Sequence, residues 1–428
     1  MKVREFIKDN LLLKVTSTNT LLVFVRMTFS LISQKALAIL IGAEGIAQVG
    51  NFKNVFNFFE QFSILGTFNG LVKYFSEYKE KEEELKKIFS TSFIFTLFAS
   101  FVSFLGLFFG ANYFNELIFG PSFNYSFAFK ILAFIVPFMG VNAIFNGFLN
   151  GLSAYKTYAK VSVVSVVLST VLLVLFTLKN NVNGSLFAIS LVPITQLLGF
   201  IIFLSKKHFS YFKNISFSLV YKNKLLTYSL MTLIVILLIN WVDITIRNLI
   251  QDTIGAKDAG YWTAMVSISK TYMQFTAALF PLYILPRYAK ITNSIEYRNE
   301  VVQICKLLLP VFVGGMVLIF LFKSIIIQIL YTSDFLAMSH LFKWQLLGDL
   351  FKLLALIVSY LFLAKKQIGY FIFTEVLSVV LFYVFSTYFI KSFGTEGIVI
   401  AHFVRYVIYL VVVFFILRNN FFGKERIL

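Results

Sequence analysis

Apolar segments about 20 residues long, of which we count about twelve, are the feature that most constrains the fold of this chain. A helix of that length crosses roughly 30 Å of hydrocarbon. Hydrophobic residues make up 59% of the 428 residues, whereas charged residues contribute only 14%. A soluble domain of this size needs more charge on its surface. The sequence therefore predicts an all-α integral membrane protein.

The predicted spans follow one another with mostly short connections. We place them at 18–41, 46–70, 89–110, 127–149, 157–178, 185–205, 225–250, 260–285, 301–322, 341–363, 368–390 and 396–417. Eleven or thirteen spans are the alternatives, because the stretch 320–345 reads as a partial span or as an interfacial helix. The basic segment before the first span has no small-residue cleavage site, so we expect this span to be retained.

The distribution of Lys and Arg tests the number and the direction of the spans. With an even number of spans, both termini lie on the same side of the membrane. The segments on that side carry 24 basic residues, whereas the opposite loops carry four, namely Lys179, Lys257, Lys323 and Lys391. Because basic residues are enriched in cytoplasmic loops, we expect a multi-pass protein of the bacterial inner membrane with both termini cytoplasmic. The net charge of +18 follows this asymmetry and does not indicate a nucleic-acid partner.

One connection, SEYKEKEEELKKI at 76–88, mixes positive and negative charges at helical spacing. Opposite charges three or four residues apart support an isolated helix. We therefore predict a solvated cytoplasmic helix between the second and third spans.

The chain divides into two halves of six spans each. The longest central connection, at 205–224, separates them, and the halves show faint similarity at an offset of about 213 residues. At this offset Lys130 corresponds to Lys343. Six spans per half give corresponding spans the same direction, which is a common plan of transporters. We predict an N-terminal lobe at 1–214 and a C-terminal lobe at 215–428, with a central cavity between them.

Polar side chains share one face of several predicted spans. At about 100° per residue, Lys53, Asn57 and Glu60 form one stripe in the second span. Asp243 and Arg247 lie four residues apart in the seventh span. Further stripes join Lys270 with Gln274, Gln345 with Asp349 and Lys352, and His402 with Arg405 and Tyr409. A charge at the bilayer centre costs about 2.5–3.5 kcal/mol on insertion scales, so these stripes are expected to face protein or water.

Basic residues outnumber acidic residues inside the spans, by ten to four. A wet cavity with this sign favours an anion, and a diphosphate suits Arg and Lys well. The expected substrate-binding residues are Arg26, Lys53, Arg247, Lys270 and Arg405. The expected coupling or polar cavity residues are Glu60, Asn57, Asp243, Gln274, Asp349 and Lys352. A structural alternative is that Asp243 with Arg247, and Asp349 with Lys352, neutralise each other within their helices.

Motifs of enzymes, metal sites and nucleotide sites are missing from the sequence. It contains no P-loop, no Gly-x-Ser-x-Gly and no His-Glu-x-x-His motif. The single cysteine, Cys305, and three scattered histidines do not indicate a metal site. We therefore expect no enzymatic activity, no cofactor and no metal, and we expect any driving energy to come from an ion gradient or from the substrate gradient.

Three segments carry a resemblance to a known family. GTFNGLVKYFSEY (66–78), TYMQFTAALFPLYILPRYAKIT (271–292) and FKWQLLGDLFKLLALIVSYLFLAKK (342–366) resemble the Wzx-type polysaccharide flippases. The pattern is nearest to the branch of that family that serves the enterobacterial common antigen. The likeness runs over nearly the whole chain, in order and with similar spacing.

The resemblance implies the fold and the cargo of the multidrug/oligosaccharidyl-lipid/polysaccharide exporter superfamily. It implies twelve helices in two lobes, alternating access, and an undecaprenyl-diphosphate-linked oligosaccharide moved from the cytoplasmic to the periplasmic leaflet. Partners would be that cargo, membrane lipids and the polysaccharide polymerase machinery, as in O-antigen assembly. The alternatives are a drug or metabolite exporter of the same superfamily and a non-transporting scaffold or membrane-embedded polymerase.

Overall fold

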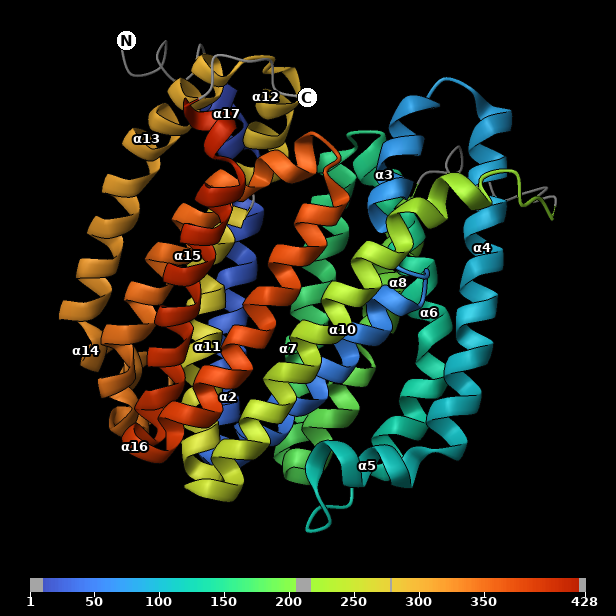
Figure 1. Ribbon diagram of the computed structural model, residues 1–428. Helices are drawn as coiled ribbons and strands as arrows, with labels where there is room; N and C mark the ends of the chain where they lie inside the picture. Colours follow the sequence, from blue (N-terminus) through green and yellow to red (C-terminus); the bar gives the residue numbers. More distant parts are fainter. Residues whose placement is uncertain (1–10, 205–216, 278, 423–428) are drawn as a thin grey trace, which may run out of the picture. The chain divides into compact units, whose positions relative to one another are not determined.

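The computed structural model describes residues 11–204, 217–277 and 279–422, and all its regular elements there are helical (Figure 1). In the first half they are α2 (Leu11–Phe62), α3 (Phe68–Glu77), α4 (Glu82–Phe104), the π-helix η1 (Leu105–Phe109), α5 (Ala111–Phe119), α6 (Ser126–Gly151), α7 (Tyr155–Ser190) and α8 (Val192–Phe203). In the second half they are α10 (Lys222–Thr253), α11 (Ala256–Ala277), the π-helix η2 (Phe280–Ile284), α12 (Leu285–Lys290), α13 (Ser294–Leu321), α14 (Lys323–Leu330), the 3₁₀-helix η3 (Ser333–Leu341), α15 (Phe342–Ala364), α16 (Ile368–Ile416) and α17 (Arg418–Phe422). The predicted all-α class is confirmed.

Long apolar helices account for the predicted spans. Within the described ranges, eight helical segments are long and apolar enough to cross a membrane. Three of the helices are interrupted by non-helical backbone, α2 at Gly42, α7 at Asn180 and Asn181, and α16 at Gly394. Dividing these three and counting α11 gives twelve segments. α11 is not one of the eight because charged and polar side chains interrupt its apolar sequence.

The predicted helix at 76–88 is wrong. α3 ends at Glu77, and α4 begins only at Glu82, so a turn at 78–81 divides the charged stretch. Three glutamates then occupy the first turn of α4, where the helix dipole stabilises negative charge. Charge spacing alone did not distinguish one continuous helix from a helix start.

Several other boundaries also differ from the predicted spans. α4 begins at Glu82 rather than at 89, and α13 begins at Ser294 rather than at 301. α2 ends at Phe62 rather than near residue 70, because Leu65 and Gly66 adopt positive φ angles and turn the chain. The ambiguous stretch at 320–345 forms the short α14 and η3, each too short to cross a membrane by itself.

The order of elements repeats at the predicted offset. Gly42, which interrupts α2, corresponds to Gly255, which separates α10 from α11, and both have positive φ. Asn181 and Gly394 also correspond, and both have positive φ. Gly184 and Gly397 also correspond. A Cβ added to Gly184 would lie 1.8 Å from the Phe176 carbonyl oxygen, and one added to Gly397 would lie 2.4 Å from that of Phe389. The two halves therefore reverse direction by the same close backbone approach.

The contacts of the chain group it into two compact units, one at Phe24–Ile244 and another that contains Thr245–Leu428. We call them the first unit and the second unit. Their boundary falls inside α10. The predicted lobe boundary after residue 214 lies in the stretch 205–216, which is outside the described residues.

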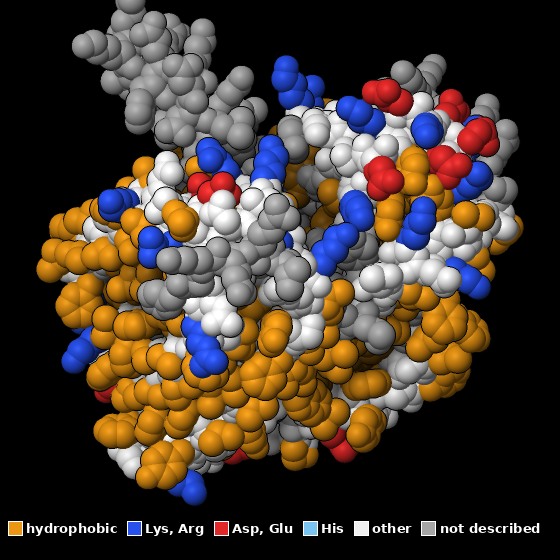
Figure 2. Space-filling model, turned by 45° about the horizontal axis from the view of Figure 1, so that its top comes forward, with side chains coloured by type: hydrophobic (Ala, Val, Ile, Leu, Met, Phe, Trp, Pro, Cys, Tyr) orange, Lys and Arg blue, Asp and Glu red, His pale blue; other side chains and the backbone are white. Residues whose placement is uncertain are grey.

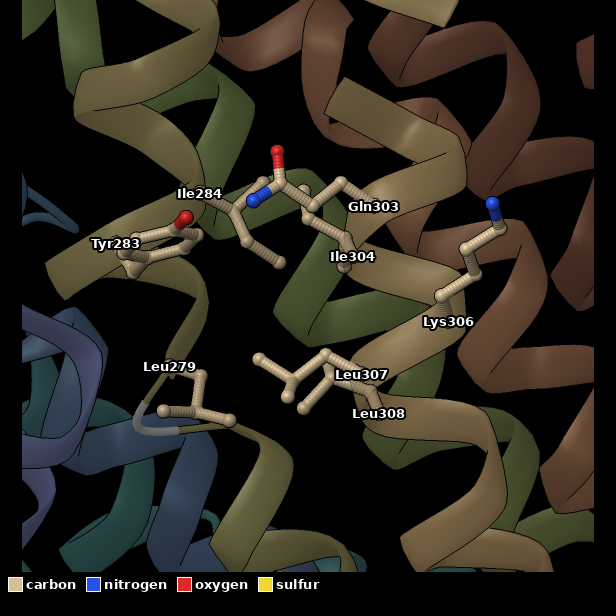
Figure 3. Close-up of a pocket in the computed structure, with 8 residues that line it drawn as sticks. All are labelled: Leu279, Tyr283, Ile284, Gln303, Ile304, Lys306, Leu307 and Leu308. Carbon is tan, nitrogen blue, oxygen red and sulfur yellow. The ribbon is translucent and has the colours of Figure 1, made fainter. Parts of the chain in front are cut away.

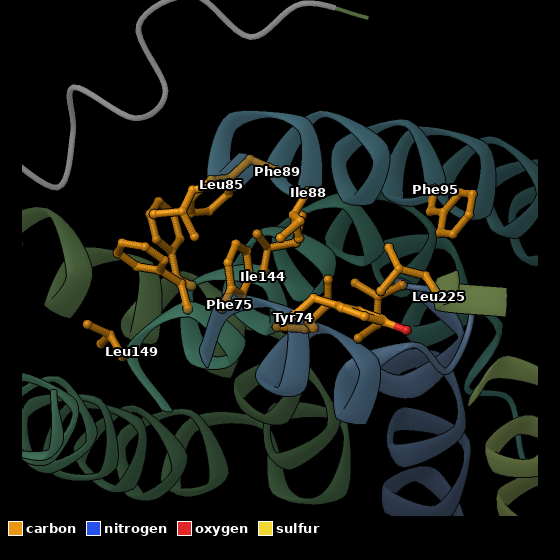
Figure 4. Packing of buried hydrophobic residues seen from close by; sticks show 14 of the residues in the cluster. Tyr74, Phe75, Leu85, Ile88, Phe89, Phe95, Ile144, Leu149 and Leu225 are labelled. Carbon is orange, nitrogen blue, oxygen red and sulfur yellow. The ribbon is translucent and has the colours of Figure 1, made fainter. Parts of the chain in front are cut away.

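Each unit has its own apolar core. In the first unit, the ring centroid of Phe75 of α3 lies 4.7 Å from that of Phe89 of α4, and both residues are labelled in Figure 4. The ring centroid of Phe148 of α6 lies 5.4 Å from that of Phe75. In the second unit, the corresponding position of Phe75 is Tyr288, which is also fully buried. Its hydroxyl donates to the carbonyl oxygen of Ile357 on α15 at 2.9 Å, so the buried phenol is satisfied.

Large apolar side chains also cover much of the surface (Figure 2). Phe109 on η1 is 74% exposed, and Val311 on α13 is 76% exposed. In water such a surface favours aggregation. In hydrocarbon it is the expected lipid-facing surface, which agrees with a multi-pass membrane protein.

Substitution of the paired glycines tests the repeated reversal. We expect Gly184→Ala and Gly397→Ala each to destabilise the protein by about 1–3 kcal/mol, because the new methyl group overlaps a backbone carbonyl. Thermal unfolding of the detergent-solubilised protein measures this effect. Gly314→Ala, where a Cβ meets nothing within 4 Å, is the matched control and should be neutral or slightly stabilising. Equal melting temperatures for all three variants would contradict the proposed close approach.

Candidate functional site

Arg26 is fixed by α7 within the first unit. Its Nη2 donates to the Ser162 hydroxyl at 2.7 Å and to the Tyr158 hydroxyl at 3.1 Å, and its guanidinium carbon lies 5.4 Å from the Tyr158 ring centroid. The side chain is half-buried. Arg26 therefore joins α2 to α7, and any role in substrate binding requires it to exchange these partners.

Lys53, Asn57 and Glu60 form the predicted stripe on α2, and all three side chains are exposed. Their neighbour Asn54 is buried on another face, where its amide donates to the Asn240 carbonyl of α10 at 3.3 Å. A charged stripe in a membrane-length helix is costly if it faces lipid. The exposed stripe therefore needs water or another polar group beside it.

Arg247 is deeply buried in the second unit, with 3% of its surface exposed. Its Nε donates to the Thr263 hydroxyl of α11 at 2.8 Å, and its guanidinium carbon lies 5.3 Å from the Trp262 ring centroid. Asp243, one turn earlier on α10, is half-buried. Arg247 therefore attaches the last turns of α10 to α11 through a hydrogen bond and a cation–π contact.

The helix α11 carries polar groups on two faces. Lys270 and Gln274 are exposed, as expected for a stripe that can reach a ligand. On another face, the hydroxyl groups of Ser269 and Tyr272 both donate to Oδ2 of Asp349 on α15, Ser269 at 2.6 Å. The same helix thus offers exposed groups and contributes to a buried network.

Asp349 is the centre of that network and is completely buried. In addition to the two hydroxyl groups, it accepts from the Gln345 amide at 3.2 Å and from Nε2 of His402 on α16 at 3.0 Å. Four donors from three helices surround one carboxylate. A buried carboxylate is stable only with such partners, so this site is specified by its whole set of side chains.

Arg405 extends the network beyond His402. Its Nη2 lies 3.1 Å from Nδ1 of His402. Its guanidinium carbon is 4.1 Å from the Phe382 ring centroid and 4.5 Å from that of Tyr406. Lys352 lies near, with Nζ 5.7 Å from the Tyr406 ring centroid. Asp349, Lys352 and Arg405, which the sequence placed in two separate stripes, therefore belong to one cluster.

Four members of this cluster were not among the predicted site residues, namely Ser269, Tyr272, Gln345 and His402. The sequence did contain a signal for two of them. Gln345 precedes Asp349 by one helical turn, and His402 precedes Arg405 by three residues. What the sequence did not reveal is that the stripes of α15 and α16 meet.

One cavity of the second unit lies apart from the predicted site residues. A cavity of about 280 Å³ lies between η2 and α13, lined mainly by Leu279, Tyr283, Ile304 and Leu308 (Figure 3). Lys306 points away from the other labelled side chains. None of the predicted site residues lines this cavity. Among the described residues, no group of three or more His, Cys, Asp and Glu side chains is placed to hold a metal ion.

Removal of the Asp349 carboxylate tests the network. We expect Asp349→Ala to destabilise the protein by about 3 kcal/mol, because several buried donors lose their acceptor. Thermal unfolding in detergent measures the loss. Asp252→Ala, at an exposed position of α10, should change stability by less than about 0.5 kcal/mol. A melting temperature of Asp349→Ala equal to that of the control would show that these donors do not depend on Asp349.

The chain is similar to known proteins in both sequence and fold. The lipid III flippases of Escherichia coli (strain K12) and Shigella flexneri are each 26% identical to it over 397 residues, which cover 92% of this chain and 94% of theirs.

A multidrug resistance MATE family transporter of the MOP superfamily in its inward-facing conformation superposes with a TM-score of 0.75 at 17% identity, covering 93% of this chain and 98% of that one. The lipid II flippase MurJ, in an inward closed conformation, gives a TM-score of 0.67 at 14% identity, covering 96% and 89%. The family described as "Polysaccharide biosynthesis protein" matches residues 12–292. The chain therefore belongs to this family of polysaccharide biosynthesis proteins.

Proposed function

We propose that this protein is a flippase that moves a lipid-linked oligosaccharide across the bacterial inner membrane. The observation that carries the proposal is the likeness to two lipid III flippases over 92% of the chain. Membership of a polysaccharide biosynthesis family and a transporter fold agree with it. On this proposal the protein is a transporter rather than an enzyme, and it moves its cargo from the cytoplasmic to the periplasmic leaflet.

The cargo in this proposal is an oligosaccharide linked to undecaprenyl diphosphate. The diphosphate is the part that cationic side chains recognise, because Arg and Lys form charge-assisted hydrogen bonds with phosphate oxygens. Lys53 and Lys270 are the exposed cations of the predicted set. Arg26, Arg247 and Arg405 complete it, and each is held by partners that a phosphate group would replace or supplement.

The remaining predicted residues supply polarity and coupling. Asn57 and Gln274 are exposed amides that can bond to sugar hydroxyl groups. Glu60 and Asp243 balance part of the positive charge, and Asp349 with Lys352 belongs to the buried cluster described above. The predicted central cationic cavity, the alternating access of the two lobes and the cytoplasmic termini are parts of this proposal. The lipid tail stays in the bilayer, and the polysaccharide polymerase machinery receives the product.

Loss of the protein should trap the cargo on one leaflet. In a deletion strain of the source organism, we expect lipid-linked oligosaccharide to accumulate on the cytoplasmic leaflet, where periplasmic glycosidase or lectin probes do not reach it. Inverted vesicles, which expose that leaflet, provide the matched measurement. Accumulation on the periplasmic leaflet would contradict a flippase. Normal export together with increased drug sensitivity would instead support a drug exporter.

Neutralisation of two predicted binding cations should impair transport. We expect Arg247→Gln combined with Lys270→Gln to reduce export at least tenfold, because two charge-assisted contacts to the diphosphate are lost. The measurement is transport of a fluorescent lipid-linked oligosaccharide in proteoliposomes containing equal amounts of folded protein. Lys257→Gln, at an exposed position on the same helix α11, is the control and should transport normally. Unchanged transport by the double variant would remove Arg247 and Lys270 from the site.

A further inference from the structure

The repeat provides an internal comparison for the Asp349 cluster. Gly184 and Gly397 fix the correspondence of α7 with α16, since both make the same close backbone approach. Lys130 and Lys343 fix that of α6 with α15, and the buried positions of these two helices match along most of their length. Each residue of the cluster therefore has an identifiable counterpart in the first half.

The counterparts of the cluster are apolar. Val136 occupies the place of Asp349, and both are fully buried. Ile189 occupies the place of His402, and each is 7% exposed. The other counterparts are Leu132 for Gln345, Met139 for Lys352, Val192 for Arg405 and Phe59 for Tyr272. The same helix arrangement is thus built in the first half without these charges, and apolar replacement of buried ion pairs is often neutral or stabilising. The fold does not require the cluster, which indicates a function.

The imidazole of His402 occupies a space made for it. A Cβ added to Gly348 of α15 would lie only 2.2 Å from Cδ2 of His402. The counterpart of Gly348 in the first half is Ile135, a large buried side chain. Because Gly348 has no side chain, the imidazole ring of His402 can approach α15 closely enough to contact Asp349.

His402 contacts Asp349, Arg405 and the Gln345 amide nitrogen, which lies 3.3 Å from Nε2, and its contacts with Asp349 and Arg405 together require the neutral ring. Nε2 donates its hydrogen to Oδ1 of Asp349 at 3.0 Å, so Nδ1 must be the unprotonated nitrogen that accepts from Arg405 at 3.1 Å. A proton added to Nδ1 would remove the acceptor of Arg405 and place two positive charges side by side. Protonation of His402 and its contact with Arg405 are therefore mutually exclusive.

The surrounding charges are balanced when His402 is neutral. Asp349 and Lys352 of α15 and Arg405 of α16 interact electrostatically with the imidazole ring of His402. Glu375 of α16 interacts with Arg405 and Lys352 and accepts from the Tyr409 hydroxyl at 3.2 Å. From α11, Tyr272 reaches the ring only through Asp349, and the Tyr406 ring lies 5.0 Å from it. Two acids face two bases, so one added proton gives the cluster a net positive charge.

We infer that His402 is a proton-binding site whose protonation releases Arg405 to bind a phosphate group of the cargo. The inference rests on the proposed function, because it takes the cargo to be a lipid diphosphate. The added proton comes from water and binds Nδ1, and no other bond is made or broken. Arg405, whose guanidinium lies between the Phe382 and Tyr406 rings, then turns away from the imidazole ring of His402. Its Nε, buried and without a hydrogen-bond partner among the described residues, becomes available with the freed Nη2.

A sodium ion fits this cluster poorly. The Asp349 oxygens already accept from four donors, which would have to turn away to admit a cation. Arg405 and Lys352 would also repel it. The site is therefore built for a proton, and an effect of sodium in place of pH would contradict it.

Binding of a charge-constant probe at different pH values tests the inference. The probe is a prenyl-diphosphate-linked N-acetylglucosamine, a diphosphate diester whose charge does not change between pH 5.5 and 8.0. We expect the affinity of the detergent-solubilised protein to increase as pH falls, by up to tenfold per pH unit for one linked proton. Substitution of Na⁺ by K⁺ should leave this dependence unchanged. Arg405→Gln should bind about tenfold more weakly at low pH, with a flat profile.

Substitution of histidines separates the site from other pH effects. His402→Gln should lose the pH dependence, whereas His340→Gln, at an exposed position of η3, should keep it. The double variant Asp349→Val with His402→Ile introduces two residues of the first half. It also leaves Ser269, Tyr272 and Gln345 without their acceptor, so its binding is measured on a matched amount of protein that thermal unfolding shows to be folded. With Arg405 released, it should bind the probe equally well at every pH.

The results distinguish failure of this inference from failure of the proposed function. Strong binding with the same pH slope in wild type and His402→Gln would overturn the proton site and leave the flippase in place. A flat profile in the wild type would do the same. No binding of the probe by the wild type at any pH would overturn both.

Discussion

Hydrocarbon solvates neither a charge nor an unpaired hydrogen-bonding group, and this constraint governs the structure. Each polar side chain in a span has to find partners inside the protein or in water. Arg26 finds two hydroxyl groups of α7, and Arg247 finds Thr263 and Trp262. Hydroxyl side chains bond to the preceding turn of their own helix, as Thr177 does to the Leu173 carbonyl. Polar residues that look unfavourable in the sequence therefore become the connections between helices.

The repeated architecture shows how such connections can differ while the frame stays the same. The backbone reversals at Asn181 and Gly394 correspond, and so do the buried positions Phe75 and Tyr288. In the first half, the apolar side chains of Val136, Ile189 and Val192 stand at the positions of Asp349, His402 and Arg405. In the second half, a carboxylate, an imidazole and a guanidinium fill the equivalent positions. A duplicated helix arrangement thus allows one copy to contain charged and titratable side chains while the helices pack in the same way.

Much of the fold follows from the sequence because membrane spans depend mainly on length and hydropathy. The all-helical class and the positions of most spans were predictable for this reason. The interruptions at Gly42 and Gly394 coincide with gaps between predicted spans, since a positive φ favours glycine. The turn at 78–81 was not predictable from charge spacing, because glutamates support both a helix interior and a helix start. The span at 260–285 was predicted from its apolar residues and overlaps α11 (Ala256–Ala277), although polar residues interrupt the apolar sequence of that helix.

The candidate site was only partly predictable, because helical periodicity places residues on a face but does not say which faces meet. It grouped Asp349 with Lys352 and, separately, His402 with Arg405, and it offered the pairing of Asp349 with Lys352 as a structural alternative. The structure supplies the contact between the two stripes and the role of Gly348, which has no sequence signature. Whether Lys53, Lys270 and the other predicted cations bind one substrate stays a prediction.

The tight reversals within α7 and α16 have a practical consequence for mapping the orientation of this protein. At Gly184 and Gly397 the chain passes so close to its own backbone that not even a methyl group fits. An epitope or a labelling cysteine inserted there would disrupt the helices that it is meant to report on. The exposed residues 79–81, in the turn between α3 and α4, are the better place for a topology reporter.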